Sequence, residues 1–199
     1  MSSIALVCAL VTALAASPDT VPAVAGKPLI RFVSIGAFKV TFEKTTPDRV
    51  KSILGPGKVS EGARGMRIAY WSSDEDHPVR VMLESQDGGH TITGCALSSA
   101  VVPSDSAFAA PRCRAKANEI VFDQGLSLGS SKQTWVAKLG TPQSQSHDAA
   151  QWARKRSWQQ PATVGGSQME TWTEWYRVAA TFQGQRLMFI DATKLTARH

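Results

Sequence analysis

Two stretches of the chain share one pattern of residues, and this pattern restricts the possible folds most strongly. Each opens with Ser or Thr suited to capping a helix, continues for about two helical turns, and stops at Gly followed closely by Pro. The stretches span residues 45–56 and 129–142. The sequence therefore predicts two short, equivalent helices. Their apolar i, i+4 pairs are Val50 with Leu54 and Trp135 with Leu139.

The residues that follow each helix have the alternating or continuous apolar pattern of strands. Tight Gly-containing turns at 87–89 and 183–185 predict hairpins, so each set of strands is antiparallel. A further hairpin is expected at 29–42, near Gly36. We expect an α+β fold of two repeated units, each a short helix packed on an antiparallel three- to four-stranded sheet. The predicted strands are 66–71, 79–86 and 90–97 in the first unit, and 152–158, 171–183 and 186–192 in the second.

The N-terminus carries the features of a secretory signal. Residues 4–16 form an apolar stretch that ends in small residues before Ser17 and Pro18. We predict a signal peptide over 1–16, with cleavage as late as residue 25 left open and a buried helix as the alternative. The mature protein is then periplasmic or secreted, without a lipid anchor. Its units are predicted at 27–97 and 119–199, joined by a linker at 98–118.

Export to an oxidising compartment would determine how the cysteines of the mature chain are interpreted. Once Cys8 leaves with the signal peptide, Cys95 and Cys113 remain, and two cysteines in an oxidising compartment predict one structural disulfide across the linker. A redox or metal site is the alternative, but it needs a closer cysteine pair or nearby His ligands. We therefore expect neither a metal nor a cofactor.

Aromatic and basic residues concentrate on three of the predicted strands. Alternate residues of a strand share a face, which groups these side chains within each strand. Aromatic residues with Arg on an exposed sheet are typical of protein-binding hot spots. The alternative is a core of tryptophans with arginines reaching out from the sheet edge, and it stays open for Trp152 and Trp158. The candidate partner-binding residues are Arg67, Trp71, Trp152, Arg154, Arg156, Trp158, Trp175 and Arg177.

The net charge of the chain indicates what kind of partner it binds. The chain has 22 Lys and Arg against 16 Asp and Glu, and residues 113–199 alone carry a net charge of +5. A basic second half favours an acidic protein surface or the anionic cell envelope. Nucleic acid is not expected, because no basic tail or nucleic-acid motif is present.

Two sequence motifs suggest a catalytic or cation-binding site but lack the surrounding structure that such a site needs. Residues 125–129 fit the Gly-x-Ser-x-Gly elbow of hydrolases, yet that elbow needs a parallel sheet with helices on both faces. The acidic cluster at 74–77 suggests a cation site, but it precedes Pro78 and has the composition of a solvated turn. We therefore expect a protein that binds rather than catalyses.

The succession of a capped helix, Leu-Gly closely followed by Pro, an aromatic strand and a hairpin resembles the BamE-like outer-membrane assembly proteins. In tandem it resembles the β-lactamase inhibitor protein family, over residues 38–192. The resemblance implies a non-enzymatic exported protein that presents a concave sheet to a partner enzyme. We therefore predict an inhibitor or immunity-type protein. The alternative is an assembly or peptidoglycan-associated factor of the cell envelope, although the lipid-anchoring cysteine of the assembly proteins is absent.

Overall fold

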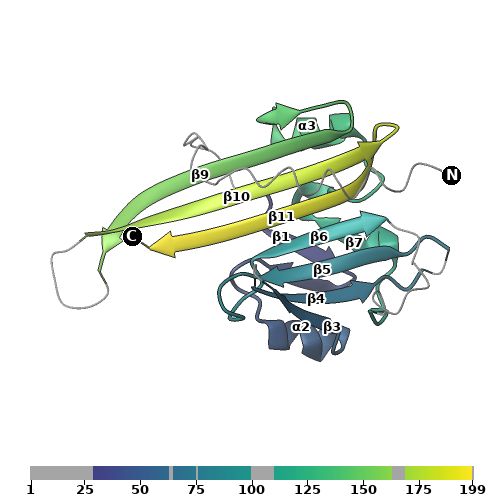
Figure 1. Cartoon of the computed structure of the whole chain (residues 1–199), viewed down its shortest axis with the longest axis horizontal. Coiled ribbons are helices and arrows are strands. Elements are labelled where there is room, and N and C mark those ends of the chain that lie inside the picture. Colours follow the sequence, from purple (N-terminus) through teal and green to yellow (C-terminus); the bar gives the residue numbers. More distant parts are fainter. Residues whose placement is uncertain (1–28, 63–64, 75, 100–109, 163–168, 199) are drawn as a thin grey trace.

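The structure is a computed structural model that describes residues 29–62, 65–74, 76–99, 110–162 and 169–198. The predicted signal peptide, residues 1–16, lies outside this part of the chain. As expected, the fold is α+β, with short helices and mostly antiparallel sheets (Figure 1). None of its described helices is long and apolar enough to cross a membrane.

Both predicted helices form with the expected caps. They are α2 (Pro47–Leu54) and α3 (Lys132–Leu139). The Thr46 hydroxyl accepts the amide of Arg49 at 3.2 Å, and the Ser131 hydroxyl accepts the amide of Thr134 at 3.1 Å. Gly55 and Gly140 end the helices with φ of +94° and +83°, a backbone region that favours glycine.

One large antiparallel sheet contains all six predicted strands after the first hairpin. Its order is β3-β4-β5-β6-β11-β10-β9-β8. Short, polar β3 and two-residue β8 carry no apolar alternation, so the sequence pattern missed them. The strands are β3 (Lys58–Gly62), β4 (Gly65–Trp71), β5 (Val79–Ser85), β6 (Gly94–Ser99), β8 (Ser144–Gln145), β9 (Ala149–Pro161), β10 (Met169–Gln183) and β11 (Arg186–Arg198).

The two sets of strands do not form separate sheets, which differs from the prediction. β6 pairs with β11 from Gly94 opposite Thr193 to Ser98 opposite Phe189. Gly94 permits this close approach, because a Cβ there would lie 2.7 Å from the Cγ2 of Thr193. Pairing between segments almost a hundred residues apart leaves no periodic signal in either segment.

A second, three-stranded sheet has the order β2-β1-β7. The hairpin of β1 (Phe32–Ile35) and β2 (Phe38–Thr41) was predicted, with Gly36 at its turn. Its third strand, β7 (Ile120–Phe122), is contributed by the second half of the chain. The halves therefore meet in both sheets.

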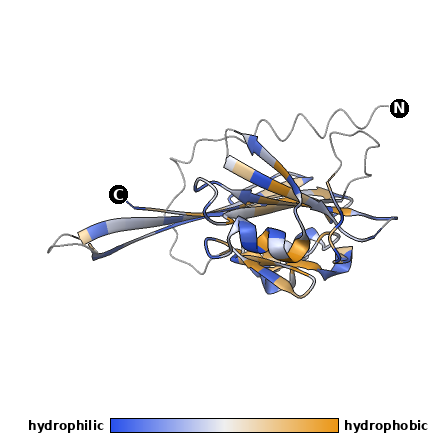
Figure 2. Ribbon diagram, turned by 90° about the horizontal axis from the view of Figure 1, so that it is seen from below, coloured by the Kyte–Doolittle hydropathy of each residue, from blue (hydrophilic) through white to orange (hydrophobic). Residues whose placement is uncertain are grey.

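The core lies on one face of the large sheet. Both helices and the three-stranded sheet contribute to it, through residues that include Val50, Trp135, Val33 and Phe122. Each helix is tied to the sheet by an aromatic donor. The Tyr70 hydroxyl donates to the Gly55 carbonyl and the Trp152 Nε1 to the Gly140 carbonyl, both at 2.7 Å. Figure 2 shows hydrophobic residues concentrated where the helices meet the sheet.

Strands β9, β10 and β11 run on beyond β4–β6 as a projecting ribbon (Figure 1). We use this name for residues 154–161, 169–177 and 194–198. Lys194 ties the ribbon to the rest of the molecule: its Nζ lies 2.5 Å from Glu43 Oε2 and 3.1 Å from Glu174 Oε1. Thr196 also donates to Glu43, at 2.8 Å. These contacts fix the start of the ribbon against the loop after β2.

Cys95 and Cys113 are buried free thiols. Cys95 lies in β6, whereas the Cys113 amide donates to Trp71 on the side of β4 away from β5. Two strands therefore lie between them, and neighbouring strands are about 4.8 Å apart. A disulfide needs Cα atoms within roughly 7 Å. The predicted disulfide is not formed in this arrangement and stays a prediction without structural support.

The turn before β6 is organised by Asp87. Its carboxylate accepts hydrogen bonds from Ser85 Oγ at 2.8 Å, from the His90 amide at 3.0 Å, and from the Thr91 amide and hydroxyl. Partial burial raises the pKa of Asp87, but the bonds from Thr91, Ser85 and His90 outweigh it and lower the pKa below its ordinary value. The carboxylate therefore stabilises the folded chain.

Asp87→Asn is expected to lower the free energy of unfolding near pH 7 by about 1 kcal/mol, the net value of lost hydrogen bonds at an exposed site. A lowered pKa contributes stability above the unfolded pKa and loses it as the pH falls through the folded pKa. The difference between variant and parent should therefore shrink below about pH 4. Urea unfolding at pH 7 and pH 3 checks this, and a difference independent of pH would contradict it.

Candidate binding face

The face of the large sheet opposite the core forms the candidate site, which we call the open face. Ile68, Leu83 and Cys95 lie side by side toward the core, so the residues that alternate with them point the other way. Among the described elements, neither helix nor the three-stranded sheet lies on this face. Its charged residues are mostly basic: Lys58, Arg67, Arg80, Lys155 and Arg177 against Glu84 and Asp191.

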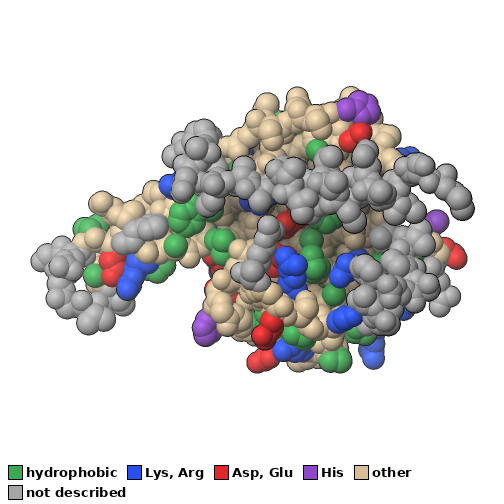
Figure 3. Space-filling view, viewed as in Figure 1, with side chains coloured by type: hydrophobic (Ala, Val, Ile, Leu, Met, Phe, Trp, Pro, Cys, Tyr) green, Lys and Arg blue, Asp and Glu red, His purple; other side chains and the backbone are tan. Residues whose placement is uncertain are grey.

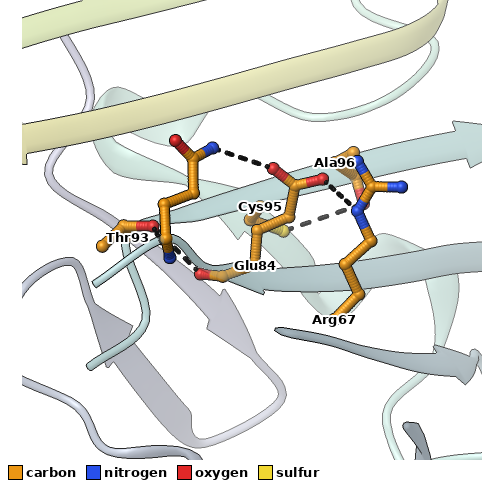
Figure 4. Close-up of polar contacts among 6 residues, drawn as sticks. Arg67, Glu84, Thr93, Cys95 and Ala96 are labelled. Atoms are coloured by element: carbon orange, nitrogen blue, oxygen red, sulfur yellow. Dashed lines mark hydrogen bonds and ion pairs between the residues drawn. The ribbon is translucent and has the colours of Figure 1, made fainter. Parts of the chain in front are cut away.

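Arg67 is held in place by a buried acid. Its Nε lies 2.8 Å from Glu84 Oε1, and Glu84 is 4% exposed (Figure 4). Gln86 Nε2 donates to the other oxygen of Glu84 at 3.3 Å. Arg80, nearby on β5, has its pKa lowered by burial and by the positive charge of Arg67. Arg67 thus compensates the negative charge of Glu84, and the other charged residues of the open face are mostly basic.

The second part of the open face is aromatic and basic. Trp175 stands between Leu195 and Lys155 on the neighbouring strands, with the Lys155 Nζ 5.7 Å from its ring centroid. Arg177 lies on the same face, two residues further along β10. Phe189 lies near the start of β11, away from the ribbon. Figure 3 shows Lys and Arg side chains over the part of the sheet formed by β4–β6 and again on the projecting ribbon.

Short side chains of β6 lie between these two parts. Gly94 and Ala96 are on the open face between Arg67 and the ribbon, followed by Thr193 and Asp191 of β11. Arg67 and Arg177 occupy the same row of the sheet, four strands apart, which is roughly 19 Å. The face is therefore wide enough for a folded partner.

Four of the eight candidate residues do not belong to this face. Arg67, Trp71, Trp175 and Arg177 lie on it, whereas Trp152, Arg154, Arg156 and Trp158 lie on the core side. As predicted, alternate residues share a face within each strand, but the two sets do not form one surface. Trp71 itself is 3% exposed, so it supports the face more than it offers contact.

The core-side group divides in two. Trp152 is 2% exposed, its ring centroid lies 6.4 Å from that of Trp135, and it belongs to the core. Trp158 lies on the ribbon, beyond the core, with its ring stacked on Trp172 at 6.5 Å. Trp135 is buried, whereas Trp172 is partly exposed and lies outside the core. Arg154 donates to the Leu139 carbonyl at 3.0 Å.

The wrong grouping has an identifiable cause. Trp152 shares the core side of the sheet with Tyr70 and not with Trp71, and Tyr70 and Trp152 each donate to the glycine that ends a helix. Arg80, Phe189 and Lys155 also lie on the open face and were not predicted. Alternation within 79–86 places Arg80 opposite the apolar valines, so that signal was present and unused.

Among the described residues, neither the Gly-x-Ser-x-Gly motif nor the acidic cluster belongs to a complete catalytic or metal site. The Ser127 hydroxyl lies 3.3 Å from that of Ser130, and the strand before it, β7, is antiparallel. Asp74 accepts a bond from the Ala117 amide, as a turn residue does. Within the part that the structure describes, no group of three or more His, Cys, Asp or Glu is placed to hold a metal.

Comparison of the chain with protein-family models, curated proteins and solved structures gives no match.

Proposed function

We propose that this chain is an exported binding protein that presents the open face to a partner enzyme and blocks it. The observation that carries the proposal is the open face itself, a broad sheet surface that joins Trp175, Phe189 and several arginines without covering helices among the described elements. Aromatic residues and Arg provide most of the energy in protein interfaces. A preformed sheet also loses little conformational freedom on binding.

The proposal includes an architecture of two repeated units, each a capped helix followed by four strands. Matched contacts support it. Besides the equivalent bonds of Tyr70 and Trp152, the chain before each helix meets the last hairpin of its own half: the Ile92 amide donates to Thr45 at 2.8 Å, and the Leu187 amide to Ser130 at 3.0 Å. The sheet order also reads as two inverted series that meet at β6 and β11.

The mechanism is occlusion without chemistry. A basic face lowers the free energy of encounter with an acidic surface, so association is fast at low salt and slows as salt screens the charges. Trp175 of β10 and Phe189 of β11 then provide apolar contact. The partner best suited to this face is a periplasmic or secreted enzyme whose active-site rim is acidic.

A capture experiment tests the proposal. The chain as its host exports it, with a C-terminal tag, is incubated with the host's periplasmic and secreted proteins. We expect stoichiometric capture of an acidic enzyme whose activity falls as the complex forms. The Trp175→Ala/Arg177→Ala variant should lose the enzyme.

The control variant is Trp158→Ala/Arg156→Ala, which removes the same residue types from the other side of the ribbon. It should retain the enzyme. Recovery of outer-membrane proteins or wall fragments would instead favour the envelope-factor alternative. Capture that survives the loss of Trp175 and Arg177 would contradict the open face as the binding surface.

A further inference from the structure

The outer edge of β9 is a second potential contact surface, separate from the open face. β8 pairs with β9 at Ala150 and Gln151 alone, yet β9 continues to Pro161. On its other side β9 pairs with β10 along its whole length, from Ala149 to Pro161, without a break in register. Among the strands of the described chain, none pairs with the outer side of residues 152–161.

The hydrogen bonds to β8 and its flanking residues identify the groups that point outward. The carbonyls of Ala149 and Gln151 accept outward bonds from Ser146 and Gln143, at 2.9 and 2.8 Å. In an antiparallel strand every second residue directs both its N–H and its C=O to the same side. The next outward residues are therefore Ala153, Lys155, Ser157 and Gln159. Pro161 has no N–H and ends the row.

The charge of this edge selects its occupant. Arg154, Lys155 and Arg156 are consecutive, and residues 149–161 contain no acid. Lys155 points to the open face and Arg156 to the core side, so an added strand meets a cation on both of its faces. A second copy of the chain would bring its own cations against these, and like charges across paired strands are unfavourable.

We propose that an extended acidic segment of a second partner protein, distinct from the enzyme bound by the open face, adds to β9 as a further strand over residues 153–159. Backbone hydrogen bonds to the outward groups would provide register and much of the affinity. Because alternate residues of the added strand share a face, its acidic side chains would lie beside Lys155 and its apolar side chains would lie beside Trp158. This proposal does not depend on the open face, because a peptide strand can occupy the edge alone.

The probe is a nine-residue peptide that alternates Glu and Val, with blocked ends, added to the full chain. We expect saturable binding that changes Trp fluorescence and slows amide exchange at Ala153, Lys155, Ser157 and Gln159. A Lys/Val peptide of equal length should bind at least tenfold more weakly. The same loss is expected when alternate amides of the Glu/Val peptide are methylated on the edge that faces β9.

Two variants separate backbone pairing from charge alone. Ser157→Pro removes one outward N–H, which β10 does not use, and should weaken peptide binding at least tenfold. Ser157→Ala is the control: it loses the hydroxyl that lies 3.0 Å from Thr173 Oγ1 but keeps the N–H, so its affinity should stay within twofold. Circular dichroism of both variants checks that the fold persists.

The proposal is overturned if Ser157→Pro and the methylated peptide bind as well as their controls, or if acidic and basic peptides bind alike. Self-association of the chain that Ser157→Pro abolishes, without peptide binding, would assign the edge to a second copy instead. Failure of the peptide to bind while the enzyme is still captured through Trp175 would refute the edge and leave the open face intact.

Discussion

Replacing Trp152 with alanine is expected to lower the free energy of unfolding by about 3–5 kcal/mol, as for other buried aromatic residues. The ring is 2% exposed and packs against Trp135, so its removal leaves a cavity between α3 and the sheet. The variant also leaves the Gly140 carbonyl without its indole donor. Both losses act on the contact that holds the second helix.

Trp158→Ala is the matched control, because it lies in the same strand and on the same side of the sheet. Trp158 is partly exposed and stacks on Trp172 beyond the core, so we expect a loss of about 1 kcal/mol. Urea unfolding followed by far-ultraviolet circular dichroism gives both values. Equal losses for the two variants would contradict the division between core and ribbon.

Gly94→Ala is expected to destabilise the chain by about 1–3 kcal/mol through overpacking, although alanine is a small residue. The new Cβ would lie 2.7 Å from Thr193 Cγ2 and 2.9 Å from the Ala192 carbonyl oxygen, which is backbone and cannot rotate away. β6 and β11 would have to separate where β3–β6 join β8–β11 in the large sheet. Faster amide exchange should therefore concentrate along β6 and β11.

Gly62→Ala provides the comparison. It also lies in a strand, β3, but a Cβ there meets nothing within 4 Å. Alanine restricts the unfolded chain more than glycine does, so this variant should be neutral or slightly stabilising. If Gly94→Ala were equally harmless, the close pairing of β6 with β11 would be wrong.

Local signals predicted the local structure well. The caps Thr46 and Ser131 and the glycines at 55 and 140 located both helices, because capping depends on residues a few positions apart. Alternation located the long strands for the same reason. β3 and β8 were not predicted, because neither is both long and alternating in apolar residues. Their positions depend on pairing with β4 and β9.

Long-range pairing could not be predicted in this way. No local pattern links Cys95 to Ala192 or Ile35 to Ile120, although these pairs join the two halves of the chain. The same limit explains the candidate site. Alternation groups side chains within a strand, but the side that faces the core depends on what packs there, so Trp152 and Trp71 ended on opposite faces.

The account rests on the open face as the binding surface, and calorimetric titration of the captured enzyme tests this most directly. The open-face variant Trp175→Ala/Arg177→Ala should raise the dissociation constant at least 30-fold, which corresponds to about 2 kcal/mol for a hot-spot residue. The core-side variant Trp158→Ala/Arg156→Ala should change it less than threefold. If the core-side variant lost binding while the open-face variant kept it, the partner would bind elsewhere and the central claim would be wrong.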